Sequence, residues 1–227
     1  MKLKKHRPIR IAIDATAGSG STSLALRIAK HYKLRYLDTG KVYRWCALQI
    51  IEKKPKNKIN FLKKQIKKLN LKELQNKKLI DDAVAQTTSV LAKSLKIRKL
   101  VHNFQKNIAY KIPKGFNGSV LNGRDITYKI IPDADFKFYV TASIFERSRR
   151  RTLELKRLGK DITFQNVLKS LKKRDKSDKN RRHSPLIKST DSLLINSTRL
   201  SITECFLKVK KIIDRKLNDY GRNFKTK

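Results

Sequence analysis

The sequence is short of acidic residues, of cysteine and of long apolar runs, and each shortage narrows the class of protein. Asp and Glu number 18 against 57 Lys and Arg, so the formal net charge is +39 and anionic partners such as nucleotides or nucleic acid are favoured. The two cysteines lie far apart and the four histidines form no H-x-x-x-H pair, so neither a disulfide framework nor a structural metal is expected. No apolar run reaches the roughly 18 residues of a membrane span, and the apolar part of residues 1–13 is too short for a signal peptide. We therefore expect a soluble cytoplasmic protein.

The two kinds of basic residue are distributed differently. Lysine is spread along the whole chain, whereas arginine gathers in a few places. A guanidinium group binds two phosphate oxygens as a fork, so the clustered arginines indicate specific anion contacts. A basic protein whose main role is to bind nucleic acid remains an alternative, although the sequence lacks the aromatic series typical of proteins that stack single-stranded bases.

The chain is organised around residues 9–23, IRIAIDATAGSGSTS. The isoleucines of its first half predict a buried strand, the small residues at 17–20 a turn, and the residues from Ser21 to Lys30 a helix. This layout lets backbone N–H groups and a helix N-terminus surround a phosphate. A phosphate-binding loop and a plain tight turn both remain open on these residues alone.

Further strands are predicted later in the chain, each separated from the next by a helical segment. They cover residues 33–37, 119–121, 134–140 and 192–196. Strands that alternate with helices predict an α/β fold, with a parallel sheet covered by helices on both faces.

Five motifs then follow one another in the order found in a known family. They are IAIDATAGSGSTS, YLDTGKVYR, LNGRDI, ADFKFYVTAS followed by ERSRRR, and RDKSDKNRRHSPL. Together they resemble bacterial cytidylate kinase, a nucleoside monophosphate (NMP) kinase, and the resemblance runs from about Ile9 to Leu217. It implies a P-loop NTPase-like parallel sheet in one domain over residues 1–227. The expected divisions are a core (about 9–52, 110–143 and 190–217), an NMP-binding insert (about 53–109) and a lid (about 147–182). The family's β-hairpin is replaced by a short lysine-rich segment, Leu69–Asp82, so we expect the insert to be helical.

The resemblance also implies an activity, namely transfer of the γ-phosphoryl group of ATP to CMP, and to dCMP, with Mg²⁺ bound to ATP. It implies ATP binding by Ala17, Gly18, Ser19, Gly20, Ser21, Thr22 and Ser23, with the Thr22 hydroxyl on Mg²⁺. It implies CMP binding by Thr39, Arg44, Ser89, Arg98, Arg124, Asp125, Arg174, Asp178 and Arg181. Catalytic roles fall on Arg147, Arg151 and Arg181, and a lid that begins near Arg147 would exclude water when it closes. The implied partners are ATP and CMP, without obligate nucleic acid or membrane, and the family habit is a monomer.

The implied base-reading residues fit the chemistry of cytosine, which offers an N4 amino donor beside N3 and O2 acceptors. That pattern requires a carboxylate near an arginine or a hydroxyl, as Asp125, Arg98 and Ser89 would supply. Simpler interpretations remain beside these roles. Arg44 could pair with Asp38, Asp125 could be a turn residue, the lid arginines could form a solvated helix face, and RDKSDKNRR could be a disordered charge run.

Three residues depart from the family pattern near the phosphate loop. Ser21 stands where the loop lysine belongs, and the loss of such a cation costs about 10²–10³ in rate. Ala15 replaces the first glycine, which predicts a strained backbone, and Asn122 replaces a carboxylate near the metal, which predicts weaker placement of Mg²⁺. The sequence therefore leaves open both an active kinase and a weakly active or inactive nucleotide-binding variant.

Overall fold

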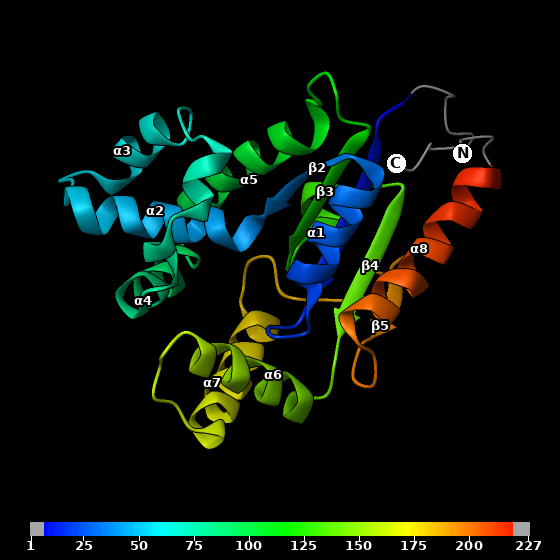
Figure 1. Cartoon of the computed structure of the whole chain (residues 1–227). Coiled ribbons are helices and arrows are strands. Elements are labelled where there is room, and N and C mark those ends of the chain that lie inside the picture. Colours follow the sequence, from blue (N-terminus) through cyan, green and yellow to red (C-terminus); the bar gives the residue numbers. More distant parts are fainter. Residues whose placement is uncertain (1–6, 220–227) are drawn as a thin grey trace.

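The computed structural model describes residues 7–219, so residues 1–6, among them His6, and residues 220–227 lie outside it. A five-stranded sheet with the order β2-β3-β1-β4-β5 forms its centre, and every neighbouring pair of strands is parallel (Figure 1). The strands are β1 (Ile9–Ala15), β2 (Leu34–Asp38), β3 (Gly118–Gly123), β4 (Phe136–Thr141) and β5 (Leu193–Asn196). The helices are α1 (Ser21–Tyr32), α2 (Thr39–Lys53), α3 (Lys58–Gln65), α4 (Asp82–Leu91), α5 (Leu95–Tyr110), α6 (Ile144–Arg157), α7 (Phe164–Asn180) and α8 (Ile202–Asp219). The predicted α/β class is confirmed.

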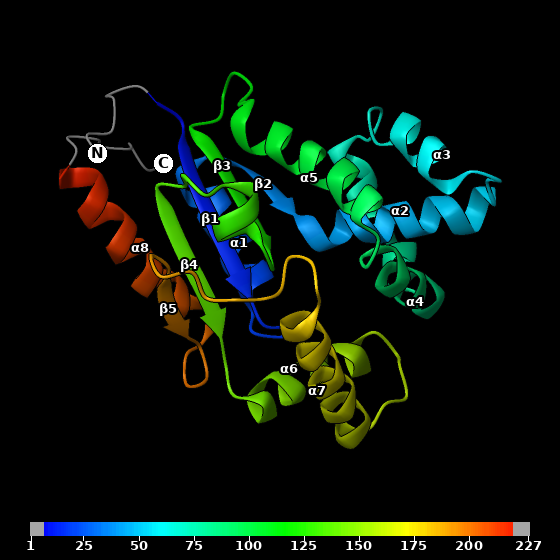
Figure 2. The same cartoon turned by 180° about the vertical axis from the view of Figure 1, so that it is seen from behind.

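Strand β1 lies in the middle of the sheet because it is apolar on both faces. Ile11 and Ile13 pack with Leu24 of α1 and Val209 of α8 on one face, whereas Ala12 packs with the core of α2 and α5 on the other. All these side chains are fully buried, and each buried Leu, Ile or Val stabilises the fold by about 1.5–3 kcal/mol. Figure 2 shows the second face from behind, with α2 and α5 beside the sheet.

Between α2 and α5 the described chain forms helical turns without a strand. Besides α3 and α4, it contains the 3₁₀ helices η1 (Leu71–Gln75) and η2 (Lys77–Ile80). Asn57, Asn70 and Asn76 accept hydrogen bonds from the backbone at the starts of these short helices, as expected of N-cap residues. The helical character predicted for Leu69–Asp82 is confirmed, while the division into core, insert and lid stays a prediction.

Helices α6 and α7 form a pair next to the end of β1. Ser143 caps α6 and Thr163 caps α7, each accepting a backbone hydrogen bond three residues on. Helix α7 continues to Asn180, so most of the charged run RDKSDKNRR is helical and the interpretation as a disordered charge run is wrong.

Within residues 7–219, no helix combines the length and the apolar character that a membrane crossing requires.

Candidate functional site

The glycine-rich turn between β1 and α1 has the backbone of a phosphate-binding loop. Gly18 and Gly20 have φ angles of +76° and +83°, which favour glycine over residues with a Cβ. The N-cap residue of α1 is Gly20, which has no side chain to accept a hydrogen bond from the first N–H groups of the helix. Ala15 belongs to β1 and has no positive φ, so the strain predicted for its methyl group is wrong.

Three polar residues from separate elements meet beside this loop. The Asn122 side-chain amide lies 3.3 Å from the Thr22 hydroxyl, and the Thr39 hydroxyl donates to the Asn122 carbonyl over 2.9 Å. Gly123 makes this approach possible, because a Cβ at that position would lie 2.3 Å from the Thr39 oxygen. The Asn122 Oδ1 atom is buried and has no hydrogen-bond partner within residues 7–219. Asn122 therefore stands next to Thr22, where the sequence placed it, with one amide oxygen unused.

Residues of α6 and of the turn after β5 form hydrogen bonds to the backbone carbonyls of the loop. Arg147, whose side chain is 6 % exposed, donates to the Ala17 carbonyl over 2.9 Å, to the Ala142 carbonyl and to Asp175. The Ser197 hydroxyl donates to the Ser19 carbonyl, and Arg150 in turn donates to Ser197. In this structure the Arg147 guanidinium therefore binds the loop and α7. Its catalytic role stays a prediction.

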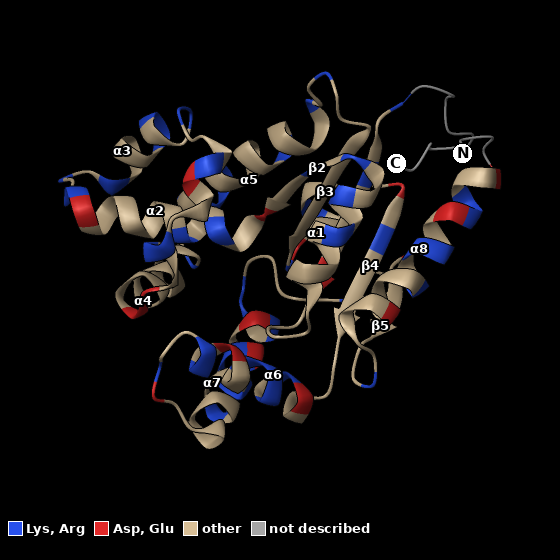
Figure 3. Ribbon diagram, in the orientation of Figure 1, with Lys and Arg blue, Asp and Glu red and all other residues tan. Residues whose placement is uncertain are grey.

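The other residues predicted in the loop differ in their exposure. Ser19 and Ser21 are buried, and the Ser19 hydroxyl has no partner among the described residues, whereas Thr22 and Ser23 are exposed. Figure 3 shows basic segments of α6 and α7 close to this turn.

Three arginines from two parts of the chain converge on Asp178 of α7: Arg124 follows β3, and Arg174 and Arg181 lie on α7 and at its C-terminal end. Its carboxylate lies 2.8 Å from Arg124, 3.6 Å from Arg181 and 4.0 Å from Arg174. Desolvation acts in the opposite direction, but the charges of these arginines hold the pKa of Asp178 below its usual value. One carboxylate therefore faces three guanidinium groups.

Arg44 and Arg151 extend this cluster toward α2 and α6. Desolvation and the charge of Arg151 lower the pKa of Arg44, and partial desolvation together with the charges of Arg124, Arg44 and Arg151 lowers the pKa of Arg174. Arg44 donates to the Leu79 carbonyl over 2.7 Å and forms no ion pair with Asp38, whose side chain instead caps α2. Arg151 pairs with Glu154 on its own helix. The predicted CMP-side arginines and Arg151 are thus gathered in one region, with an excess of positive charge that is suited to an anion.

A second carboxylate, Asp125, lies at the buried side of this cluster. Arg98 donates to it over 3.2 Å and also to the Ala92 carbonyl, and its guanidinium lies over the Tyr43 ring. Although desolvation opposes it, nearby His102 and the charges of Arg181 and Arg98 hold the pKa of Asp125 below its usual value. The structure brings Asp125 and Arg98 together as predicted.

Ser89 is not brought to this pair. It lies on α4 with an exposed side chain, and its hydroxyl donates to the Ala85 carbonyl of its own helix. No hydrogen bond joins Ser89 to Asp125 or Arg98 in the described chain.

Some buried polar atoms near this site have no hydrogen-bond partner in the part of the chain that the structure describes. Within residues 7–219 they include side-chain atoms of Ser19, Tyr43, Thr88, His102, Asn122, Asp175 and Arg181. Because an unpaired buried polar group costs about 1–3 kcal/mol, a ligand or water that hydrogen-bonds to these atoms would stabilise the folded chain.

Comparison with known proteins agrees with this geometry. Residues 11–215 match the family model described as cytidylate kinase. Curated relatives named cytidylate kinase include one from Bartonella tribocorum, 36% identical over 92% of this chain and 95% of its own. Another, from Brucella ovis, is 37% identical over 92% of this chain and 94% of its own. The chain belongs to the cytidylate kinase family.

A solved structure supports the fold of this kinase. It is that of an uncharacterized protein from Eubacterium ventriosum, which superposes with a TM-score of 0.51 at 16% identity and covers 91% of this chain and 98% of its own. At that identity the likeness concerns the fold alone.

Sequence reasoning missed four residues of this kinase that touch the site. They are Tyr43, which lies beside Arg98, His102, beside Asp125, Asp175, which binds Arg147, and Ser197, which binds the loop. A signal existed for two of them. His102 follows Arg98 by four residues on one helix, and Asp175 precedes Asp178 by three, so each shares a helix face with a predicted residue.

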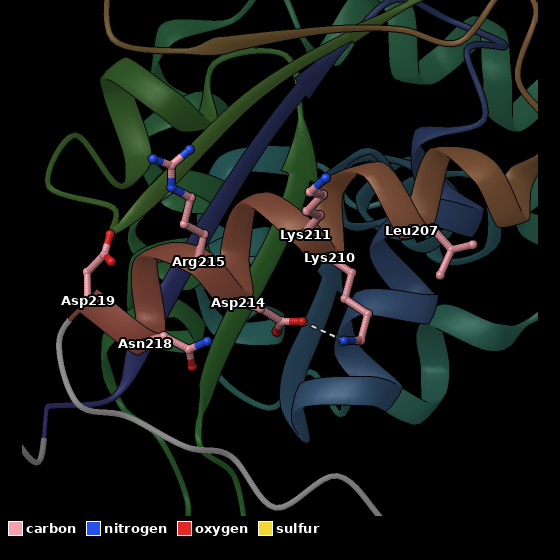
Figure 4. Close-up of a pocket in the computed structure, with 7 residues that line it drawn as sticks. All are labelled: Leu207, Lys210, Lys211, Asp214, Arg215, Asn218 and Asp219. Carbon is pink, nitrogen blue, oxygen red and sulfur yellow. Dashed lines mark hydrogen bonds and ion pairs between the residues drawn. The ribbon is translucent and has the colours of Figure 1, made fainter.

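A surface pocket elsewhere on the kinase lies along the second half of α8 (Figure 4). It is lined by Leu207, Lys210, Lys211, Asp214, Arg215, Asn218 and Asp219. Lys216 of the same helix segment reaches the carbonyl of Asp135 just before β4, so the pocket lies toward the amino ends of the strands. The glycine loop follows the carboxyl end of β1, and the pocket is therefore separate from the candidate site.

Proposed function

We propose that this kinase transfers the γ-phosphoryl group of ATP to CMP, and likewise to dCMP. The observation that carries the proposal is the convergence of Arg124, Arg174 and Arg181 on Asp178, next to the Arg98–Asp125 pair. A phosphate beside three guanidinium groups and a base beside a carboxylate describe a pyrimidine monophosphate. Membership of the cytidylate kinase family supports the same acceptor.

On the donor side, the free N–H groups at the start of α1 and the loop of residues 17–23 would hold the ATP phosphates. Thr22 and Asn122 present the oxygen donors that fit Mg²⁺, which would neutralise charge on the transferring group. No group of three His, Cys, Asp or Glu side chains in residues 7–219 is arranged to hold a metal. In the proposed complex, phosphate oxygens of the nucleotide would complete the ligand set.

On the acceptor side, Arg44, Arg124, Arg174 and Arg181 would fix the CMP phosphate in line with the donor, and Thr39 would contact the nucleotide near the start of α2. Asp178 would accept from a sugar hydroxyl. Asp125 would accept from the cytosine N4 amino group while Arg98 holds that carboxylate, and Ser89 would reach the base after α4 moves toward it. Positioning and charge compensation of this kind supply most of the catalysis in phosphoryl transfer.

Arg147, Arg151 and Arg181 would stabilise the charge of the transferring phosphoryl group once α6 and α7 close over the site. Closure would also exclude water, which otherwise accepts the phosphoryl group. In the present conformation Arg147 holds the loop and Arg151 pairs with Glu154, so this role requires their rearrangement. We further propose a cytoplasmic monomer that needs neither nucleic acid nor membrane.

The decisive experiment is a coupled assay with ATP, Mg²⁺ and CMP, run on the natural chain and on Ser21→Lys. Restoring the loop cation is expected to raise turnover by about 10²–10³. Turnover of the natural chain within tenfold of ordinary nucleotide kinases would dismiss the inactive alternative. No gain from Ser21→Lys would show that the donor loop is wrongly assigned. Tight, steeply salt-dependent binding of an oligonucleotide, with no preference of the chain for CMP, would favour the nucleic-acid alternative.

A further inference from the structure

A histidine that no motif accounts for lies against the proposed base-reading carboxylate. His102 follows Arg98 by one turn of α5, and its Nε2 atom lies 3.2 Å from Asp125. The side chains of Arg98, His102 and Asp125 are 4 %, 13 % and 8 % exposed. The two atoms are in close contact, but they do not form an aligned hydrogen bond.

Both partners of Asp125 use the same oxygen. Arg98 and His102 each contact Oδ2, whereas Oδ1 accepts no hydrogen bond from any residue that the structure describes. The contacts from Arg98 and His102, on neighbouring turns of α5, restrict the orientation of the Asp125 carboxylate more than either contact alone would. The Oδ1 atom then has a defined position and can accept a hydrogen bond from a ligand.

A fixed, ionised carboxylate distinguishes the two common pyrimidines. Cytosine carries a donor at position 4, where uracil carries an acceptor. An ionised oxygen accepts from the first and repels the second, whereas a carboxyl group that can rotate or hold a proton accommodates both. The titratable and charged groups that face Asp125 are His102 and Arg98 of α5, Arg181 at the end of α7 and Asp14 of β1. The first three favour the ionised form of Asp125, whereas a negative charge on Asp14 opposes it.

We infer that His102 is a positioning residue for base selection. It holds Asp125 with Oδ1 free for the 4-amino group of the nucleotide and so sets the preference for CMP over UMP. The inference rests on the proposed function, because it takes Asp125 as the group that reads the base.

Calorimetric binding of CMP and UMP tests the inference without requiring turnover. His102→Leu removes the contact and is expected to lower the ratio of CMP to UMP affinity about tenfold, the lower range for a lost interaction with a charged group. His102→Gln keeps a donor and is expected to recover part of the ratio. His31→Leu removes a half-buried histidine from α1 and is expected to leave the ratio unchanged.

Asp125→Asn separates a failure of the inference from a failure of the proposed function. If Asp125 reads the base, Asp125→Asn abolishes the preference, and adding His102→Leu lowers it no further. A ratio that survives Asp125→Asn would overturn the proposed base reading. A ratio lost with Asp125→Asn but intact in both His102→Leu and His102→Gln would overturn the role of His102 alone. Thermal unfolding of each variant shows that it is folded, and His102→Gln replaces the leucine variant if that one is not.

Discussion

Replacing Asp178 by asparagine would remove the one carboxylate that three arginines share. The change keeps the size of the side chain and removes its charge, so Arg124, Arg174 and Arg181 are left facing one another. The folded chain is expected to lose stability, and it is expected to regain it when an anion binds beside the three arginines.

The magnitude follows from the distances. At an effective dielectric constant of about 20, a pair of unit charges 2.8 Å apart, as for Arg124, interacts by about 6 kcal/mol, and pairs at 3.6 and 4.0 Å by about 4–5 kcal/mol. Desolvation of the carboxylate offsets most of this, and removing one partner of a buried pair costs about 3–5 kcal/mol in measured cases. Arg174 is 52 % exposed and therefore screened, so we expect Asp178→Asn to destabilise the fold by about 2–3 kcal/mol.

Urea unfolding with and without inorganic phosphate measures both effects. Phosphate that binds only the folded state stabilises it by mass action, and the gain is expected to be larger for Asp178→Asn than for the natural chain. Asp191→Asn is the matched control, since Asp191 pairs with Lys137 at the surface and is 57 % exposed. Its loss is expected to cost less than about 1 kcal/mol and to leave the phosphate effect unchanged. An Asp178→Asn variant as stable as the natural chain, or one that phosphate stabilises no more strongly, would refute the anion cluster.

Three further predictions concern the loop and its surroundings. Desolvation raises the pKa of Asp14 to about 6, so the stability from this group is complete below about pH 4 and is lost as the pH rises through 6. In urea unfolding, the stability of the natural chain relative to Asp14→Asn should therefore fall by about 2 kcal/mol between pH 4 and 7, and a constant difference would contradict the raised pKa of Asp14. Arg147→Lys cannot maintain all the bonds of the guanidinium to Ala17, Ala142 and Asp175. We expect the free energy of unfolding, measured by thermal unfolding, to fall by about 2–4 kcal/mol. An unchanged midpoint would show that these hydrogen bonds of Arg147 do not stabilise the fold. Gly123→Ala would place a methyl group 2.3 Å from the Thr39 oxygen. We expect the variant to be less stable to unfolding by about 1–3 kcal/mol. An unchanged free energy of unfolding would mean that the backbone shifts to make room for the methyl group.

The parts of the fold that sequence predicted are those with a local cause. The apolar residues of β1 and the glycines after it determine a strand and a turn by themselves, and the structure contains both. Helix α7 runs through the charged stretch to Asn180, and Asp178 there pairs with Arg124, Arg174 and Arg181. Charge composition alone gives no sign of that pairing, since Arg124 arrives from a distant strand end.

The site was predictable as a set of residues but not in its contacts. The resemblance to the cytidylate kinase family nominated Arg98 and Asp125, and they pair. It also nominated Ser89, whose hydroxyl bonds within α4 instead, as serine does in the absence of a nearer partner. The actual position of Ser89 depends on how α4 packs against α2, which is a tertiary effect.

The contacts of α6 and α7 with the glycine turn couple the movements of these two parts of the chain. The methyl group of Ala17 packs between Val167 and Leu171 of α7, and its carbonyl is bound by Arg147 of α6. If α6 and α7 close over the site as proposed, their swing would move the turn as well, and a nucleotide bound in the turn would resist that swing. Binding of the first substrate would then change how readily the helix pair closes, so the order in which ATP and CMP bind would depend on this contact.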